Sequence, residues 1–303
     1  MDRAGLIVGA LAIVVAVGFV IPHLVPRPTS SSESNVTLVV SRDFGRVVLG
    51  SWEMTPGQTV MEMLRNVTDV ETRYGGMFLY EMFGLRSSVS NKTDWLYYVN
   101  GVFMDVGLST YRPRPGEVVQ IDYHRWGRYS GSPGFLSGYP AIATVGLKGR
   151  KRNTTIAASR GLLKLAQRLR RSLQSEEAPS PTVAEQTSMH LESLRGNLII
   201  LATKDDASLC EEVIDLGKNV LYPSTLREGQ IWLNGATSSG EILAEGCTVQ
   251  CVYLPARDLW TMIILGTDGK WVRRAIDEIG SERTRFVAAF AVSPSGIIEL
   301  PLE

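Results

Sequence analysis

An apolar run near the N-terminus sets the strongest limit on how this chain can fold. The 18 residues 4–21 include no charged or polar side chain. As a helix rising 1.5 Å per residue, such a run crosses most of a ~30 Å hydrocarbon core. A secretory signal has a shorter apolar region and a small-x-small cleavage site, whereas Pro22, His23 and Pro26 follow this run. We therefore expect residues 1–25 to form one uncleaved transmembrane anchor, the alternatives being a cleaved signal or a buried soluble helix.

Glycosylation sequons indicate on which side of the membrane the body lies. Arg3 and Arg27 flank the run on opposite sides, so flanking charge decides nothing. Asn-x-Ser/Thr sequons begin at Asn35, Asn66, Asn91 and Asn153. Their excess over chance favours a body outside the cytoplasm in an organism that glycosylates, although Asn-x-Thr is also common in turns. We expect a single-pass protein of the cell membrane with its body outside.

The composition excludes several classes of protein. The chain has 303 residues, 44% of them hydrophobic and 20% charged, and no net charge, which predicts a globular body and no nucleic-acid partner. Its three Cys are too few for a disulfide framework. Cys247 and Cys251 share one predicted strand and lie ~13 Å apart, too far for a disulfide. Cys210 could pair only if the fold brings it close, so buried free thiols and no metal site are expected.

Residues 36–126 are predicted to form a first domain, after a Pro- and Ser-rich tether at 26–35. Strands are expected at 36–41 and 46–52, and an amphipathic helix at 59–66. Further strands are expected within 70–85, broken at Gly75-Gly76, at 95–104, turning at Asn100-Gly101, and at 117–123. One short helix against four or five strands predicts a small α+β roll.

Residues 127–303 are predicted to form an α/β domain. A basic segment comes first, because the stretch from Tyr123 to Ser175 has eleven Lys and Arg but no Asp or Glu. A strand is expected at 141–148 and a helix at 154–173, whose cationic face is either solvated or a surface for anionic lipid or an acidic partner. A mobile loop is expected at 174–193. Strands are then expected at 198–203, 230–234, 248–254, 260–265, 286–292 and 297–300, with helices at 207–216 and 271–279.

Catalytic signatures are absent from the sequence, which favours a binding protein over an enzyme. There is no Gly-x-Ser-x-Gly, P-loop, Gly-x-Gly-x-x-Gly after a strand, or His-Glu-x-x-His. Thr and Asp follow two strands, at Thr203 to Asp206 and at Thr267-Asp268. These residues are either helix caps or ligand contacts, and the Asp205 and Asp268 strand ends are a second place to look for a site.

The best candidate for a ligand site is the end of the strand at 117–123. Alternation places Gln120, Asp122 and His124 together on one face, which we expect to be open. His124, Arg125 and Trp126 offer a hydrogen-bonding group, a cation and a flat apolar plate, with Tyr111 in the preceding turn. We expect these four residues to bind a large, flat, partly charged ligand.

A resemblance to a known family supports the α+β fold predicted for residues 36–126. The stretch Trp95-Leu-Tyr-Tyr-Val-Asn-Gly101, followed by Val106-Gly107 and Pro115-Gly-Glu-Val-Val119, resembles the β-grasp module of the transcobalamin C-terminal-like family. The resemblance implies a β-grasp domain at 36–126. With the α/β domain that follows and the transmembrane helix that precedes it, the expected fold is an α+β β-grasp domain followed by an α/β domain, behind one N-terminal transmembrane helix. In the vitamin carriers this module caps one face of cobalamin, whereas many microbial members are surface proteins. This chain lacks the helical domain that completes the carriers' pocket.

Two hypotheses of function follow. One is a membrane-anchored extracytoplasmic ligand-binding protein that captures cobalamin, or another large nutrient, for a transporter and needs no cofactor. The other is a structural or protein-interaction module of the cell surface without a small-molecule ligand.

Overall fold

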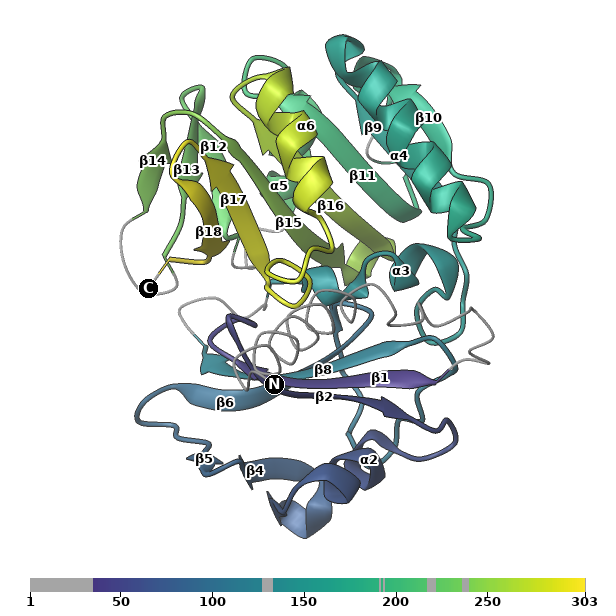
Figure 1. Ribbon diagram of the computed structural model, residues 1–303, viewed down its shortest axis with the longest axis vertical. Coiled ribbons are helices and arrows are strands. Elements are labelled where there is room, and N and C mark those ends of the chain that lie inside the picture. Colours follow the sequence, from purple (N-terminus) through teal and green to yellow (C-terminus); the bar gives the residue numbers. More distant parts are fainter. Residues whose placement is uncertain are drawn as a thin grey trace, which may run out of the picture. The chain divides into compact units, whose positions relative to one another are not determined.

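A computed structural model of the protein describes residues 35–126, 133–190, 192, 194–216, 222–235 and 240–302. Asn35–Glu303 form one compact unit with a mixed α+β fold (Figure 1). The predicted anchor at 1–25 and all but the last residue of the tether lie outside the described residues. Within the described ranges, no helix reaches the length and apolar character that a membrane crossing requires.

A five-stranded sheet carries the N-terminal part of this unit. Its strand order is β2-β1-β8-β6-β7, with β1 and β8 parallel and every other pair antiparallel. The strands are β1 (Val36–Arg42), β2 (Val47–Met54), β6 (Thr93–Val99), β7 (Val102–Phe103) and β8 (Val118–Arg125). The predicted strands and the turn at Asn100-Gly101 are confirmed.

One face of this sheet packs on a short helix, α2 (Val60–Val67), and the apolar side chains of both lie in one buried cluster. The helix begins with a capping box, in which Thr59 and Glu62 each satisfy a backbone N–H of the other. A small antiparallel sheet follows, formed by β3 (Val70–Arg73), β4 (Phe78–Met82) and β5 (Leu85–Arg86). The predicted helix and the break at Gly75-Gly76 are thus confirmed.

A seven-stranded sheet carries the C-terminal part, in the order β10-β9-β11-β16-β15-β17-β18. Helices α4 and α6 cover one face, and α5 with the small sheet β12-β13-β14 covers the other (Figure 1). The strands are β9 (Thr154–Ala158), β10 (Thr182–Glu185), β11 (Gly196–Thr203), β15 (Cys247–Leu254), β16 (Leu259–Gly266), β17 (Ala289–Ser293) and β18 (Gly296–Leu300). The remaining elements are α4 (Leu163–Ser175), α5 (Ser208–Leu216), α6 (Gly269–Glu278), β12 (Ser224–Arg227), β13 (Gln230–Leu233) and β14 (Glu241–Leu243). The apolar runs of β11 and β16 are buried throughout, as strands covered on both faces require.

Three expectations between residues 141 and 193 are wrong in part, although α4 confirms a helix over residues 163–173. The predicted strand at 141–148 begins as a one-turn helix, α3 (Ala141–Thr144). Three consecutive residues of α3 are buried, which fits neither the helical period of 3.6 residues nor the strand period of 2. The first residues of the predicted helix at 154–173 form β9, because Thr154, Thr155 and Ile156 are β-branched and suit a strand between two parallel neighbours. The predicted loop at 174–193 includes β10, which lies at an edge of the sheet, where one side needs no partner.

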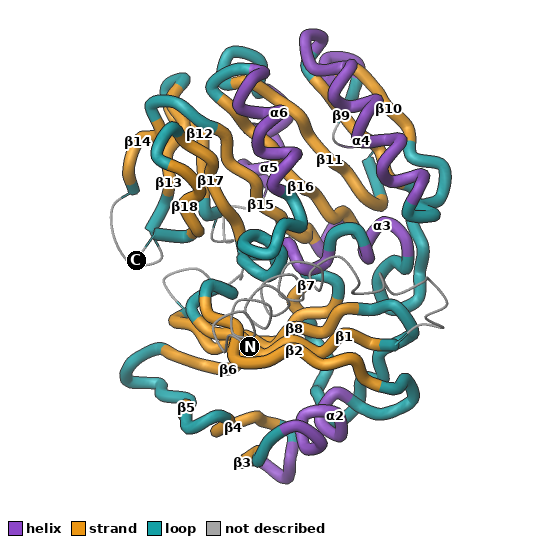
Figure 2. The backbone as a smooth tube through the Cα atoms, in the orientation of Figure 1, coloured by secondary structure: helices purple, strands orange, loops and turns teal. Residues whose placement is uncertain are grey.

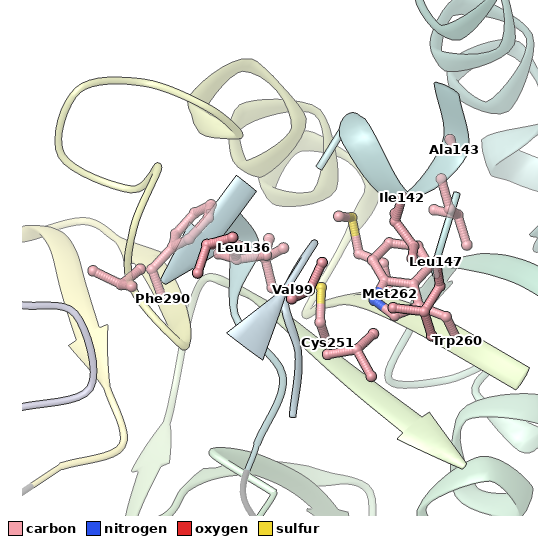
Figure 3. Close-up of a cluster of buried hydrophobic side chains, with 14 of the residues drawn as sticks. Val99, Leu136, Ile142, Ala143, Leu147, Cys251, Trp260, Met262 and Phe290 are labelled. Carbon is pink, nitrogen blue, oxygen red and sulfur yellow. The ribbon is translucent and has the colours of Figure 1, made fainter. Parts of the chain in front are cut away.

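The two sheets share one hydrophobic core. Its buried side chains come from both, among them Val99 on β6, Leu136, and Trp260 and Met262 on β16 (Figure 3). Residues 133–138 cross between the sheets and bond to both: Phe135 N donates to Gly101 O (2.9 Å) and Gly134 N to Cys251 O (3.0 Å). At one edge of the first sheet, β7 lies against β15 (Figure 2). The parts of the chain on either side of the predicted boundary at residues 126 and 127 therefore pack against each other.

Candidate functional site

The polar face of β8 is not open, so this part of the predicted site is wrong. Gln120, Asp122 and His124 do share a face, but each is at most 3% exposed. Residues 133–138 and 286–288 cover them: Gln120 Nε2 donates to Phe286 O (2.8 Å), and Phe135 and Ala288 join Phe44 in an apolar cluster on the same face. The alternation predicts which residues share the face, but not what covers it.

Asp122 is the centre of a buried hydrogen-bond network. Its Oδ1 accepts from Ser41 Oγ (2.6 Å) and Gly45 N (3.0 Å). Its Oδ2 accepts from Phe44 N (3.0 Å) and lies 2.7 Å from His124 Nδ1. A carboxylate without exposed surface is stable only when its oxygens are satisfied in this way. The network therefore fixes the β1–β2 turn on β8 and has a structural role.

The same network lacks the geometry of a catalytic triad. A nucleophilic serine must donate to the histidine that serves as its base. Ser41 Oγ instead donates to the carboxylate and accepts from Gln120 Nε2 (2.9 Å). The ring of His124 stacks on Phe44, with 4.2 Å between ring centroids. The contacts of Ser41 and His124 thus stabilise the fold, and they do not place the serine hydroxyl so that it could pass a proton to the histidine.

Tyr111 does not join His124, Arg125 and Trp126 at the end of β8. Arg125 is exposed, and 39% of Trp126 is exposed where β8 ends. Tyr111 is half-buried, and its Oη donates to Glu117 Oε2 (2.8 Å). Glu117 precedes β8, so this contact lies seven residues, roughly 23 Å of strand, from His124. The structure therefore places Tyr111 and His124 at opposite ends of β8.

Helix capping accounts for one of the two Asp-containing strand ends. Asp268 caps α6, and its carboxylate accepts from Lys270 N (2.8 Å) and Trp271 N (3.1 Å). Thr267 Oγ1 is bonded to the backbone of Gly246. At the other end, Asp205 is exposed, and the backbone carbonyl of Asp206 accepts from Ser159 and Gln186. The capping interpretation is confirmed for Asp268.

A cleft beside β7 is the strongest candidate site. We call it the β7 cleft; residues 102–105, 147–152 and 253–258 supply the side chains that line it. Its volume is about 560 Å³, within the range of small-ligand pockets. The three segments come from the edge of the first sheet, the turn before β9 and the turn between β15 and β16. Its lining includes the partly exposed rings of Phe103 and Tyr253.

Two ion pairs organise the charges of the β7 cleft. Lys148 Nζ contacts Asp105 Oδ1 at 2.7 Å, which lowers the pKa of that carboxyl. Arg152 Nη2 contacts Asp258 Oδ1 at 2.5 Å, and the same oxygen accepts from Tyr253 Oη (2.6 Å). With Arg150, three cations and two carboxylates line the cleft.

Sequence reasoning missed this cleft. The basic run Lys148-Gly-Arg-Lys-Arg152 belongs to the acid-free segment of the sequence, but its partners lie far away in the chain: Asp105 is 43 residues before Lys148, and Asp258 is 106 residues after Arg152. Only the fold brings them together. For metal binding, the described residues include no cluster of three His, Cys, Asp or Glu side chains, and the three Cys are buried thiols without a disulfide.

Comparisons with known proteins match only part of the chain. Residues 57–125 match the model of a family described as a domain of unknown function, DUF4430. A search of curated proteins gives no match. Among solved structures, a protein from Ruminococcus gnavus, provisionally described as metal-binding, is similar with 18% sequence identity and a TM-score of 0.26. That similarity covers 30% of this chain and 96% of that protein.

Proposed function

We propose that this chain is a membrane-anchored, extracytoplasmic protein that binds a small ligand and is not an enzyme. The observation that carries the proposal is the β7 cleft, which has ligand-sized volume, aromatic surface and convergent charges. By contrast, the hydrogen bonds of the buried polar network around Asp122 hold the β1–β2 turn on β8 and do not form a reaction centre.

Exposure of the sequons supports a body outside the cytoplasm. Asn35, Asn66, Asn91 and Asn153 are all exposed. An N-linked glycan needs an accessible acceptor, so all four meet the steric condition. Residues 1–25 supply the apolar run that we assign to the membrane.

Within this proposal, residues 36–126 form a β-grasp domain of the transcobalamin C-terminal-like kind. Supporting this, the Tyr97-Tyr-Val-Asn-Gly101 motif forms the β6–β7 turn, and the first and last strands pair in parallel across the sheet. The DUF4430 match covers most of the same segment. Cobalamin, or another large nutrient handed to a transporter, is the ligand that the resemblance suggests, whereas the volume of the β7 cleft, about 560 Å³, suits a smaller one.

Titration with cobalamins and a nutrient-metabolite mixture tests ligand binding. The full-length chain in non-ionic detergent should retain one component, detected by a change in cobalamin absorbance or by native mass spectrometry. Phe103→Ala should weaken that retention, whereas Val89→Ala, at an exposed position outside the cleft, should not. If nothing is retained, the interaction-module hypothesis is favoured.

Protease treatment of intact host cells tests the orientation. Degradation of the body, together with glycan on at least one of the four exposed sequon residues, is the expected result. Complete protection until the cells are lysed would place the body inside and overturn the extracytoplasmic part of the proposal.

A further inference from the structure

The carboxylates of the β7 cleft are already neutralised, which leaves the cleft with excess positive charge. Asp105 is paired with Lys148, and Asp258 accepts from both Arg152 and Tyr253. Arg150 also lines the cleft and is exposed, and it has no ion pair within the described residues. The local excess is therefore one cation, although the whole chain has no net charge.

The guanidinium of Arg152 is held in place but incompletely satisfied. Its side chain is only 12% exposed, it bonds Asp258 through Nη2, and its Cζ lies 5.9 Å from the centre of the Tyr253 ring. The other terminal nitrogen, Nη1, is buried without a hydrogen-bond partner among the described residues. A buried guanidinium N–H without an acceptor is unfavourable, and carboxylate and phosphate oxygens are the acceptors that suit it best.

An apolar surface lies beside these cations. Phe103 belongs to the two-residue edge strand β7 and is 46% exposed, although it is aromatic. Tyr253 adds a second ring in the same lining. Exposed aromatic surface next to an unpaired cation suits a ligand with a flat apolar part and one anionic group.

We propose that the β7 cleft binds a small amphipathic anion, in which a carboxylate or a phosphate monoester is joined to a flat apolar group. Arg150 and Arg152 bind the anionic end, and Phe103 packs on the apolar end. This inference rests on the proposed ligand-binding function and names the chemical class that the cleft selects.

Phenyl phosphate is the probe for the test, followed by ³¹P line broadening with the full-length chain in non-ionic detergent. Phenyl phosphate should bind more tightly than inorganic phosphate. Benzoate should compete with it, and neutral benzyl alcohol should not. If benzoate competes, a carboxylate serves as well as a phosphate monoester; if benzoate does not compete although phenyl phosphate binds, the cleft selects the phosphate.

Three variants test the assigned roles. Arg150→Gln should weaken phenyl phosphate binding about ten-fold, and Arg152→Gln about thirty-fold, the loss typical of a desolvated charged anchor. Phe103→Ala should abolish the preference for phenyl phosphate over inorganic phosphate. Arg171→Gln removes an exposed cation of α4 outside the cleft and should change nothing. Arg150 and Phe103 are exposed, so their variants should fold even if Arg152→Gln does not.

Two results would overturn the inference. If Arg150→Gln binds phenyl phosphate as the unchanged chain does, or if no anion binds at all, the cleft is not an anion site. If benzyl alcohol binds in a manner sensitive to Phe103→Ala, the cleft still binds ligands and only the anionic class is wrong. That outcome separates failure of this inference from failure of the proposed function.

Discussion

At the scale of single residues, Asp122 makes the sharpest stability prediction. Asp122→Asn places an amide N–H₂ against groups that themselves donate, from Ser41 and the backbone of Gly45, or from Phe44 and His124. Leaving buried donors unsatisfied should lower the free energy of unfolding by about 3 kcal/mol. Urea denaturation measures the loss.

The exposed Asp205 supplies the control for Asp122. Asp205→Asn removes the same charge at the surface and should change stability by less than about 0.5 kcal/mol. Equal effects of the two substitutions would mean that the buried network contributes nothing.

Glu117 makes a prediction about pH. The side chain has no exposed surface, and burial raises its pKa above the ordinary value of 4.5, although hydrogen bonds from Arg114 N and Tyr111 Oη oppose the shift. The folded state therefore keeps a proton that the unfolded chain releases, so the contribution to stability is present below pH 4.5 and is lost as the pH rises through the folded-state pKa.

The comparison of unfolding free energies at pH 5 and pH 8 checks this sign. Glu117→Gln removes the titration, so the variant should lose less stability than the unchanged chain between the two pH values. Glu245→Gln, at an exposed position, should behave like the unchanged chain. Parallel pH profiles for Glu117→Gln and the unchanged chain would contradict the assignment.

At the scale of elements, the close backbone contact at residues 133–138 predicts that added side-chain atoms there lower stability. A Cβ at Gly138 would collide with Asn100 O, and one at Gly101, where φ is +72°, with Phe135 O. Because main-chain atoms cannot move aside, Gly138→Ala and Gly101→Ala should each lower the free energy of unfolding by about 3 kcal/mol. Thermal unfolding measures this.

Gly161 supplies the matched control, because it lies in a helical turn and a Cβ there would meet nothing within 4 Å. Gly161→Ala should be neutral or slightly stabilising. A melting temperature for Gly138→Ala equal to that of the Gly161 control would show that the two sheets are joined loosely.

Elements with a clear period, or with a long apolar run such as those of β11 and β16, could be predicted from sequence, and short buried elements with neither could not. The α2 helix was predictable because its apolar residues keep one stripe and Thr59 caps it. The start of β9 was not, because Thr154, Ile156, Ala157 and Ala158 are all buried and show no period.

The candidate site shows the same limit more strongly. Alternation along β8 correctly placed Gln120, Asp122 and His124 on one face, but part of their cover comes from 166 residues away, where Phe286 O accepts from Gln120 Nε2. The β7 cleft joins Phe103, Arg152 and Asp258 from three segments whose contacts no local pattern encodes.

At the scale of the whole molecule, we predict that the body folds without its apolar N-terminus. Asn35–Glu303 form a compact unit by themselves, so deletion of residues 1–28 should give a monodisperse protein on size exclusion without detergent. The full chain should require detergent. Aggregation of the shortened chain, with the full chain soluble in buffer, would show that the apolar run belongs to the core.

The parallel pairing of β1 with β8 has a consequence for the order of synthesis. β1 is made early, yet it cannot pair with β8 until about 80 further residues have been added. The sheet face that carries Gln120 and Asp122 is covered only after Phe286 has been made. Contacts so distant in sequence form slowly and leave a nascent chain exposed in the meantime. The polar side chains of Ser41, Gln120 and Asp122 can bond to water while that face is uncovered. A polar face of this kind stays hydrated until its cover is made, whereas an apolar face exposed for as long would favour aggregation of the nascent chain.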